Sequence, residues 1–444
     1  MSQQHRWLSP SNRTLLSLLS LGLLLIVAAC GGDSGNYKTT QTNNSGGIGV
    51  NGDAKFSGNI IFVKKRNMFI LHGKDGSLTQ LTSDGTTLQP AISPDNSTIA
   101  FEVRKSGNDY SDIATMPVTG GAITMRTDDS LHDKSTGRPY HYLFWANNPI
   151  WTGDGQNLIY TTDFFKGGKT TRYSNQTCPG ISDGPNSSYI LDMGIAEMPA
   201  NAQAAPALDQ PPTLLAWPYC LAGGDQDLSL RPGVADTEVL FTSFQYAGAK
   251  NDLISQLSLL IIPASGQEQV IQLSPQDPNA LPLQASWSPD GKSITYIRRE
   301  KGQDNLYVMS VPDTITGTPN DESYIISQHG ATKRSVYYTN TDYYAASQKL
   351  ADGIVGNPIW INGHQLVYMQ LMQLDNGNQE FDLFLANLKF STPAASTTPT
   401  ASPTGAAATG TPGAASAPGI AIDGKPIQLT QGGVDGESRP VWFP

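Results

Sequence analysis

The chain has little of what marks the common enzyme and metal-binding classes: of its 444 residues, six are histidine and three are cysteine. It contains no Gly-x-Ser-x-Gly segment, which excludes the nucleophile elbow of α/β-hydrolases. It contains no His-Glu-x-x-His and no Cys-x-x-Cys segment, which excludes the common zinc motifs. Gly168-Lys169-Thr170 resembles the end of a phosphate-binding loop, but Asp163 stands where that loop requires its first glycine. From these absences we predict that the protein is not an enzyme and carries no cofactor.

Clusters of positive charge are missing as well. The 28 lysines and arginines are outnumbered by 38 aspartates and glutamates, and no run of basic residues occurs. Nucleic acids and anionic lipid surfaces attract proteins through basic patches. We therefore expect no nucleic-acid partner and no direct attraction to an anionic membrane.

Long helical periodicity is absent after the N-terminal leader, and a short pattern recurs in its place. Each copy has an apolar or aromatic residue, a turn and a β-rich strand. In the best turn, Ser-Pro-Asp-Gly, proline presets φ, aspartate bonds its own backbone and glycine accepts a positive φ. The copies are Gln89 to Phe101, Asn148 to Tyr160, Leu228 to Phe241, Gln284 to Tyr296 and Asn357 to Tyr368, with a partial sixth at Arg439 to Pro444. Two further strands follow in each copy, the last ending in Leu-Thr or Leu-Ser, so a repeat has the four strands of one propeller blade.

The sixth copy stops at Pro444 and is completed only by the strand Gly58 to Val63 near the start. A repeat split in this way favours a closed ring, because the two half-repeats can pair with each other and leave no unpaired edge. The sequence therefore predicts an all-β, six-bladed propeller over residues 58–444, closed by pairing of the C-terminal strand with the N-terminal strands.

The pattern resembles the TolB-like propeller repeat family, whose usual form runs Leu-Thr, a loop, Pro-x-Trp-Ser-Pro-Asp-Gly and a strand ending in an aromatic residue. The match covers nearly everything from Gly58 to Pro444; Gln284 to Tyr296 fits best and Leu228 to Phe241 fits worst. The resemblance implies the ring but no particular activity, since propellers serve as enzymes, receptors and scaffolds. A leader and a linker are expected in place of the separate N-terminal domain that TolB itself would imply.

The N-terminus reads as an export signal. A weakly basic region with Arg6 and Arg13 precedes an apolar run from Leu15 to Ala29, and the run leads into Ala28-Ala29-Cys30-Gly31. This ending resembles a bacterial lipobox, which implies that residues 1–29 are removed and that lipid on Cys30 anchors the protein outside the cytoplasmic membrane, in the cell envelope. The alternatives are an uncleaved helix or ordinary secretion with a free Cys30. Residues 30–57, rich in Gly, Ser, Asn and Thr, are predicted to form a flexible tether.

Cys178 and Cys220 are the cysteines that remain. An exported pair can persist as a disulfide. In a propeller, the connection between the second and third strands of a blade and the connection to the next blade leave from the same face, which we call the upper face. Cys178 lies in the first kind of connection and Cys220 in the second, within one blade. We therefore predict a Cys178–Cys220 disulfide; the alternative is two unpaired thiols.

Long loops on a rigid ring are where propellers usually place function. The major excursions, all predicted to leave from the upper face, are Thr127 to Asn147, Phe164 to Ser188, Ala216 to Gln226 and Gln328 to Gly356. The Ala/Ser/Thr/Pro insert at 391–419 is predicted as a disordered spacer between the third and fourth strands of the last blade, on the lower face. The tether is expected to enter from the lower face, so that the upper face points away from the membrane.

Aromatic residues in two of these loops are the predicted binding surface, because Tyr and Trp suit protein interfaces and sugar stacking. They are Tyr140, Tyr142, Phe144, Trp145, Tyr337, Tyr338, Tyr343 and Tyr344. The alternative is that they pack the loops onto the ring. The leading hypothesis is a monomeric, lipid-anchored module outside the cytoplasmic membrane that binds an envelope protein or glycan.

A rival hypothesis is a solute-binding protein or carbohydrate-active enzyme with its site at the mouth of the central channel, where His132, His141, His329 and Asp227 are candidates. Asp225 and Asp227 border that entrance and could hold Ca²⁺ through oxygen ligands. A third hypothesis is a structural envelope protein without a discrete ligand. The aspartates of the repeat turns, Asp95, Asp154 and Asp290, are predicted to be turn formers.

Overall fold

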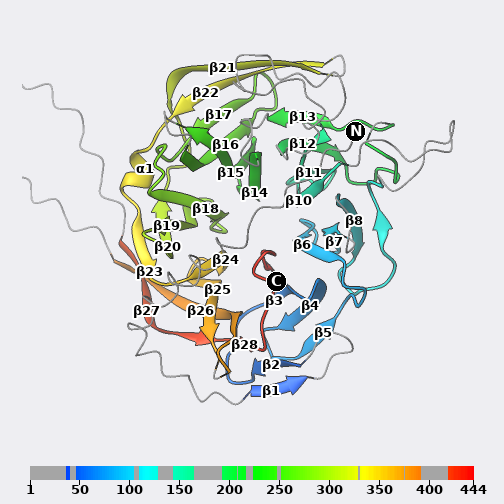
Figure 1. The fold of residues 1–444 in the computed structure, drawn as a ribbon, viewed down its shortest axis with the longest axis vertical. Helices are drawn as coiled ribbons and strands as arrows, with labels where there is room; N and C mark the ends of the chain where they lie inside the picture. The colour runs from blue at the N-terminus through cyan, green and yellow to red at the C-terminus, as the bar shows by residue number, and fades with distance from the viewer. Residues whose placement is uncertain are drawn as a thin grey trace, which may run out of the picture. The chain divides into compact units, whose positions relative to one another are not determined.

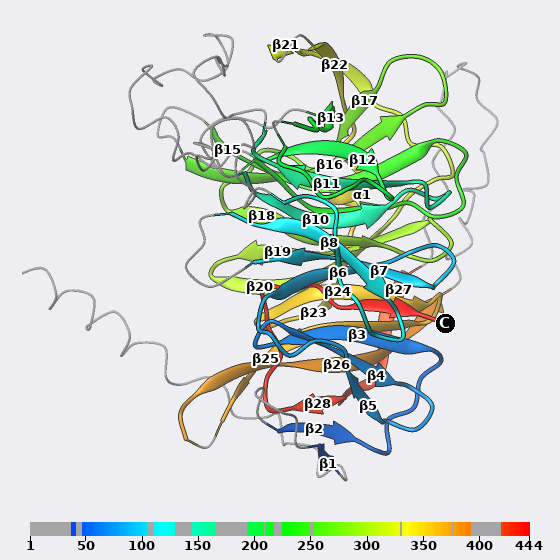
Figure 2. The ribbon, with the colours of Figure 1, turned by 90° about the vertical axis from the view of Figure 1, so that its right-hand side faces the viewer.

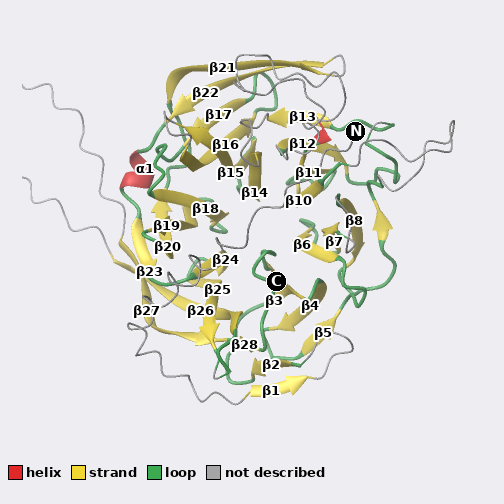
Figure 3. Ribbon diagram, viewed as in Figure 1, coloured by secondary structure: helices red, strands yellow, loops and turns green. Residues whose placement is uncertain are grey.

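Strands make up nearly all of the described secondary structure in this computed structural model, with one short helix, α1 (Asp342–Ala345) (Figure 3). The structure describes residues 37–40, 47–104, 110–128, 144–164, 193–207, 209–216, 224–247, 252–328, 331–374, 376–391 and 419–444. They belong to one unit, Asn36–Pro444.

Six sheets within the described residues repeat one antiparallel order, and each is a blade. The innermost strands are β6 (Thr87–Ile92), β10 (Ala146–Trp151), β14 (Gly224–Leu230), β18 (Ala280–Trp287), β24 (Val355–Asn362) and β29 (Val441–Phe443). The second strands are β7 (Thr98–Val103), β11 (Asn157–Thr162), β15 (Thr237–Ala247), β19 (Ser293–Glu300), β25 (Gln365–Gln373) and β3 (Asn59–Lys64). The third strands are β8 (Asp112–Pro117), β12 (Gly194–Pro199), β16 (Asp252–Ile262), β20 (Gln303–Ser310), β26 (Gln379–Ser391) and β4 (Asn67–His72). The fourth strands are β9 (Thr124–Met125), β13 (Thr213–Ala216), β17 (Gln269–Gln272), β23 (Gln348–Ala351), β27 (Gly419–Gln428) and β5 (Leu78–Gln80).

The inner strands contact one another in the circular order β6, β10, β14, β18, β24, β29 and back to β6 (Figure 1). The ring closes where β29 pairs antiparallel with β3, so that Val441 lies opposite Ile61 and Phe443 opposite Asn59. The predicted six-bladed propeller and the predicted closure of its ring are both confirmed.

The repeat motif has a local physical role in the structure. Each predicted turn aspartate accepts a hydrogen bond from the backbone N–H two residues later, at 3.1 Å for Asp95, 3.0 Å for Asp154 and 3.1 Å for Asp290. These bonds fix the turn between the first and second strands. The hydroxyls that end the repeat act similarly: Thr82 and Ser274 each accept a 2.9 Å bond from a backbone N–H of their own third strand.

The apolar core lies between blades, because successive side chains of a strand face opposite sides of its sheet. In β3, Ile60 and Phe62 pack toward the last blade, whereas Ile61 and Val63 pack toward the first. All four side chains are fully buried. Burial of such side chains contributes about 1.5–3 kcal/mol each, so the interfaces between blades supply most of the stability of the ring.

The excursion predicted at Gln328 to Gly356 does not leave from the upper face. β23 is the fourth strand of its blade, so residues 311–347 join the third and fourth strands, a connection that starts at the lower face. Within this segment, β21 (Thr318–Gln328) and β22 (Ala331–Thr339) form a hairpin, and β22 pairs in parallel with β17 of the preceding blade (Figure 1). The prediction was wrong because the excursion was assigned to the link between blades rather than to the blade itself.

The N-terminal path also differs from the expected flexible tether. β1 (Tyr37–Thr40), β2 (Ile48–Asn51) and β28 (Thr430–Gln431) form a small sheet (Figure 2). Ile48, Val50 and Phe56 are buried, so apolar contacts hold this segment against the ring. Gly47 accepts a 3.3 Å bond from Lys64 Nζ, at the upper end of β3. The described chain therefore lies at the upper end of its blade before β3 begins. The prediction that the tether enters from the lower face loses its basis.

The Ala/Ser/Thr/Pro insert lies in the expected connection. β26 and β27 stay paired as far as Ser391 opposite Gly419, so the insert joins the third and fourth strands of the last blade. Residues 392–418 lie outside the described residues.

Candidate binding site at the ring centre

A bulge with a left-handed residue interrupts five of the inner strands at the same place. These residues are Gln89 (φ 49°), Asn148 (φ 49°), Asp227 (φ 60°), Gln284 (φ 52°) and Asn357 (φ 47°). The register of each inner strand shifts at this point. A bulge turns a side chain away from its regular direction, and it recurs in proteins next to functional sites. Arg439 has the corresponding position in the sixth repeat.

The bulge side chains link successive blades around the ring. Asp227 Oδ2 accepts a 3.0 Å bond from the backbone N–H of Gln284, and Gln284 Oε1 accepts a 2.8 Å bond from that of Asn357. Asn357 Nδ2 then donates a 2.8 Å bond to the carbonyl of Gly436. A left-handed backbone is uncommon for such residues, and these hydrogen bonds offset its cost.

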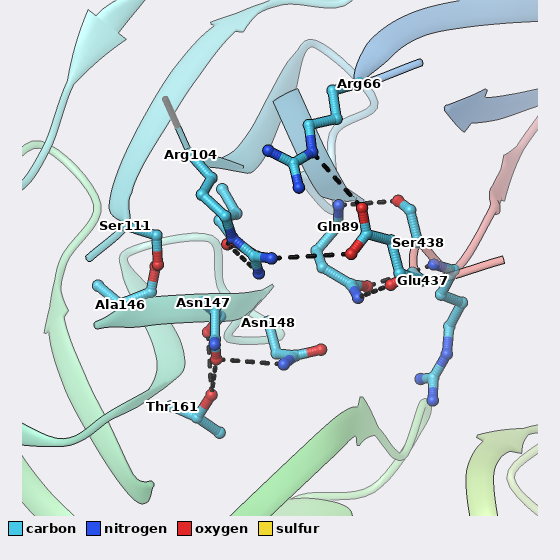
Figure 4. A network of polar contacts seen from close by, with 12 residues as sticks. Arg66, Gln89, Arg104, Ser111, Ala146, Asn147, Asn148, Thr161, Glu437 and Ser438 are labelled. Atoms are coloured by element: carbon cyan, nitrogen blue, oxygen red, sulfur yellow. Dashed lines mark hydrogen bonds and ion pairs between the residues drawn. The ribbon is translucent and has the colours of Figure 1, made fainter. Parts of the chain in front are cut away.

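The segment before the closing strand is fixed by the first blade (Figure 4). The backbone N–H of Gln89 donates a 2.9 Å bond to Ser438 Oγ, and Gln89 Nε2 donates a 2.5 Å bond to the carbonyl of Glu437. Gln89 Oε1 accepts a 3.3 Å bond from the backbone N–H of Arg439. Gln89 therefore holds the backbone of Glu437, Ser438 and Arg439 in place while the side chain of Glu437 stays half-exposed.

Arg439 crosses the ring centre to the opposite blade. Its Nη1 donates a 3.0 Å bond to the carbonyl of Leu228, and its Nη2 lies 3.9 Å from Asp227 Oδ1. Nη2 itself is buried and makes no hydrogen bond to the described residues. Burial lowers the pKa of Arg439, and the negative charge of Asp227 opposes this effect.

Two more arginines and an aromatic residue lie around Glu437, two residues before Arg439. Arg66 Nε lies 3.5 Å and Arg104 Nη1 lies 3.7 Å from the two carboxylate oxygens of Glu437. Arg104 also pairs with Glu102, with Nη2 2.7 Å from Oε1. The guanidinium of Arg104 lies over the ring of Trp145, 5.0 Å from the ring centroid. Burial raises the pKa of Glu102, and Arg104 counteracts the rise.

Asn148 is the bulge residue whose side chain takes no part in these hydrogen bonds between blades. Its Nδ2 donates a 3.2 Å bond to Asn147 Oδ1, and Thr161 also donates to Asn147. Among the described residues, no side-chain hydrogen bond joins Asn148 to the blade on either side. Figure 4 shows the side chains of Gln89, Arg104 and Asn148 directed toward a common space beside Glu437. We call Arg66, Gln89, Arg104, Asn148 and Glu437 the central site.

The aromatic residues predicted as a binding surface fall into two groups in the structure: most of those described pack in the core, and Trp145 lies beside the central site. Phe144 is 3% exposed and packs edge-on against Phe164, with ring centroids 5.0 Å apart. Tyr337 and Tyr344 are also buried, and Tyr338 and Tyr343 pack against the cluster around Tyr344. These side chains contribute to the core. Trp145 is half-buried and lies beside the central site.

Tyr344 belongs to a second polar and aromatic group, on the side of the β18–β19–β20–β23 blade that packs against the preceding blade. Its ring stacks on Tyr296 at 5.4 Å, and the guanidinium of Arg298 lies over Tyr307 at 4.2 Å. Burial raises the pKa of Tyr344, while Arg298 opposes the rise. The three rings are buried and belong to a core cluster that includes apolar side chains of the preceding blade, so the group presents little free surface.

Several predicted site residues lie outside the described residues. They are Cys30, Tyr140, Tyr142, Cys178, Cys220, His132, His141 and His329. Of the suggested Ca²⁺ ligands, Asp225 is buried, and Asp227 is engaged with Gln284 and Arg439. No group of three or more His, Cys, Asp or Glu side chains within the described residues is arranged to hold a metal ion. No helix in that part of the chain has the length and apolar character needed to cross a membrane.

Sequence reasoning missed the central site, although the repeat carried a signal for it. The residue three positions before the apolar or aromatic anchor of each copy is polar in all six copies: Gln89, Asn148, Asp227, Gln284, Asn357 and Arg439. A polar residue repeated at one place in an inner strand indicates a ring of polar side chains at the centre of a propeller. Arg66, Arg104 and Glu437 have no such repeat signal, because they come from three different connections.

Comparison with known proteins finds no matching family profile and no matching curated protein. Solved structures that match include TolB from Acinetobacter baumannii, at 14% identity and a TM-score of 0.43, with 76% of this chain and 62% of that chain covered. A putative TolB from Agrobacterium tumefaciens matches at 15% identity and a TM-score of 0.37, covering 57% of this chain and 73% of that one. Oligogalacturonate lyase from Vibrio parahaemolyticus matches at 11% identity and a TM-score of 0.38, covering 79% and 82%. This chain thus spans less than two thirds of the first TolB chain, and the six-bladed ring rests on its own sheet order.

The expectation that the protein is not an enzyme is corrected by these matches. A lyase and prolyl endopeptidases are among the structures found. Because propellers serve as enzymes as well as scaffolds, the missing hydrolase and zinc motifs do not exclude catalysis.

Proposed function

We propose that this β-propeller is a lipid-anchored module outside the cytoplasmic membrane that recruits a protein or glycan of the cell envelope at its central site. The observation that carries the proposal is the gathering of Arg66, Arg104, Glu437 and Trp145 at the upper end of the ring centre. Each comes from a different connection, and the rigid ring below holds them in one place.

The test compares variants on opposite faces of the ring. Trp145→Ser removes the half-buried aromatic residue beside the central site, and Phe390→Ser removes an aromatic residue, 42% exposed, at the lower end of β26. Each protein is captured from gently solubilised membranes, and the co-purified material is identified by mass spectrometry. We expect a partner with the wild type and Phe390→Ser, and its loss with Trp145→Ser. A partner that stays with Trp145→Ser would contradict the proposal.

Anchoring and the disulfide are separate parts of the proposal. Lipid on Cys30 requires that Cys30→Ala release the protein from membranes. A Cys178–Cys220 disulfide requires that neither thiol react with an alkylating reagent until a reductant is added. Alkylation of both cysteines without reductant would contradict the pairing.

A second candidate function uses the same site for the chemistry of a solute or an oligosaccharide. It is favoured by Glu437, a half-exposed carboxylate between two guanidinium groups. Turnover of an oligosaccharide by the wild type that is lost in Glu437→Gln or His141→Ala would favour this candidate.

A further inference from the structure

Glu437 is a loosely held carboxylate at the centre of the proposed recruiting site. Its oxygens lie 3.5 Å from Arg66 Nε and 3.7 Å from Arg104 Nη1, and 49% of its side chain is exposed. Charge-assisted hydrogen bonds between guanidinium and carboxylate are usually about 2.7–2.9 Å long. The contacts of Glu437 with Arg66 and Arg104 are therefore longer than the hydrogen bonds that a well-placed carboxylate would make with the same two arginines.

The backbone explains why Glu437 does not come closer. Its carbonyl accepts a bond from Gln89 Nε2, and the next residue, Ser438, accepts one from Gln89 N–H. The backbone is thus fixed while the side chain has no hydrogen bond within the described residues. Glu437 can turn toward solvent without any movement of the ring.

The N–H donors of Arg66 and Arg104 outnumber the carboxylate oxygens that they contact. Arg104 directs Nε and Nη2 to Glu102, which leaves Nη1 facing Glu437. Glu437 is the carboxylate that Arg66 contacts among the described residues. Arg439, two residues further along, has a buried Nη2 without a hydrogen bond. Two guanidinium groups therefore share the single carboxylate of Glu437, while the guanidinium of Arg439 lies at the opposite blade beside Asp227.

The groups around these arginines suit hydroxyls. The amides of Gln89 and Asn147 are engaged within the protein, whereas Asn148 Oδ1 accepts no hydrogen bond from the described residues and can accept one from a hydroxyl. Trp145 adds an aromatic ring, which suits stacking against the apolar face of a sugar. The amide oxygen of Asn148, an aromatic ring and a guanidinium pair with long contacts to Glu437 favour a sugar acid over a peptide, whose carboxylate would use the arginines alone.

We propose that the central site binds an acidic saccharide, whose carboxylate replaces that of Glu437 between Arg66 and Arg104. Glu437 is then an internal competitor that occupies the site until the saccharide arrives. The exchange swaps one carboxylate for another, so the charge of the site stays the same and the gain comes from shorter hydrogen bonds. This inference rests on the proposed function and names the chemistry that the site recognises.

The test titrates the full purified chain with a trisaccharide of galacturonic acid, with its methyl ester, and with the tripeptide Glu-Glu-Glu, by calorimetry. We expect binding of the acid and not of the ester. Loss of the internal competitor in Glu437→Gln should tighten binding about threefold, the size of an exposed ion pair. Arg66→Gln should weaken binding about tenfold, because it removes a charge-assisted bond to the ligand. Lys292→Gln, which removes an exposed cation from a turn on the lower face, should leave binding unchanged.

Equal binding of acid and ester, or an unchanged affinity in Glu437→Gln, would overturn the proposal. Binding of the tripeptide without the trisaccharide would overturn the saccharide assignment. If no probe binds while capture of an envelope partner still depends on Trp145, the saccharide inference fails and the recruiting function stands.

Discussion

Arg439 and Asp227 have the same repeat position in opposite blades, and their side chains meet across the ring centre with Nη2 and Oδ1 3.9 Å apart. Arg439 belongs to the segment that closes the ring, and Asp227 belongs to the blade furthest from that closure. Their contact, with the 3.0 Å bond from Arg439 to Leu228, ties the closing segment to the far side of the ring. The closing strand itself is only three residues long, from Val441 to Phe443.

Arg439→Gln should destabilise the protein by about 1.5–3 kcal/mol, because the bond to Leu228 is lost and Asp227 is left without its cation. The measurement is the midpoint of urea unfolding. Lys349→Gln serves as a control, since Lys349 pairs with Asp352 on the surface and its loss should change stability by less than about 1 kcal/mol. Equal midpoints for Arg439→Gln and the wild type would show that the crossing contributes nothing to closure.

The neighbours Phe144 and Trp145 should separate packing from binding. Phe144→Ala should cost about 3–5 kcal/mol, because the ring is buried and packs against Phe164. Trp145→Ala should cost less, because Trp145 is half-buried and covers Arg104. Thermal unfolding of both variants measures the difference. A larger loss for Trp145→Ala would reverse the roles assigned to the two residues.

Much of the fold could be predicted from the sequence because the turn chemistry repeats. Asp95 and Asp290 form the expected turns, and the split sixth copy predicted that the closing strand pairs with the strand Gly58 to Val63. The excursion from Gln328 was misplaced because the four-residue strand β23 has no strong pattern of its own. Ile48 and Val50 were assigned to a flexible tether because they lie in a glycine-rich segment, and the short strand that they form depends on pairing with β1 and β28.

The site was harder to predict because it is assembled in three dimensions. Gln89 and Asn148 share a repeat position, and their polar character was visible in the sequence. Arg66, Arg104 and Glu437 lie in unrelated segments, and only the ring brings each arginine within 4 Å of the Glu437 carboxylate. No local sequence pattern indicates that these three residues lie close together.

The left-handed bulges predict which substitutions the inner strands tolerate. Gln284→Val should destabilise the protein by about 1–3 kcal/mol, because a β-branched residue is strained at φ 52° and cannot accept the bond from Asn357. Gln284→Gly should cost less, because glycine adopts this φ freely and only the bond is lost. Urea unfolding of the two variants gives the comparison. A valine variant as stable as the glycine variant would show that the bulge relaxes.

Asp382 should make stability depend on pH in an unusual direction. It is 1% exposed, and its carboxylate accepts bonds from Gln428, Thr430 and Gly433. Burial, followed by the charge of Glu380, raises the pKa of Asp382 to about 7. In the unfolded chain an aspartate titrates near about 3.9. Between these two values the folded protein holds a proton that the unfolded chain has released, so the free energy of unfolding falls as pH rises from 4 toward 7.

Asp382→Asn should remove this dependence, because the asparagine is neutral at every pH and keeps an acceptor for Thr430 and Gly433. We expect its urea midpoint to change less between pH 4 and 7 than that of the wild type, and to exceed the wild-type midpoint at pH 7 and above. Asp423→Asn, which alters an exposed aspartate of the neighbouring strand β27, should keep the wild-type slope. A wild-type midpoint that rises steadily from pH 4 to 7, with the same slope in Asp382→Asn, would mean that Asp382 is ionised in the folded protein and that its hydrogen bonds outweigh its burial.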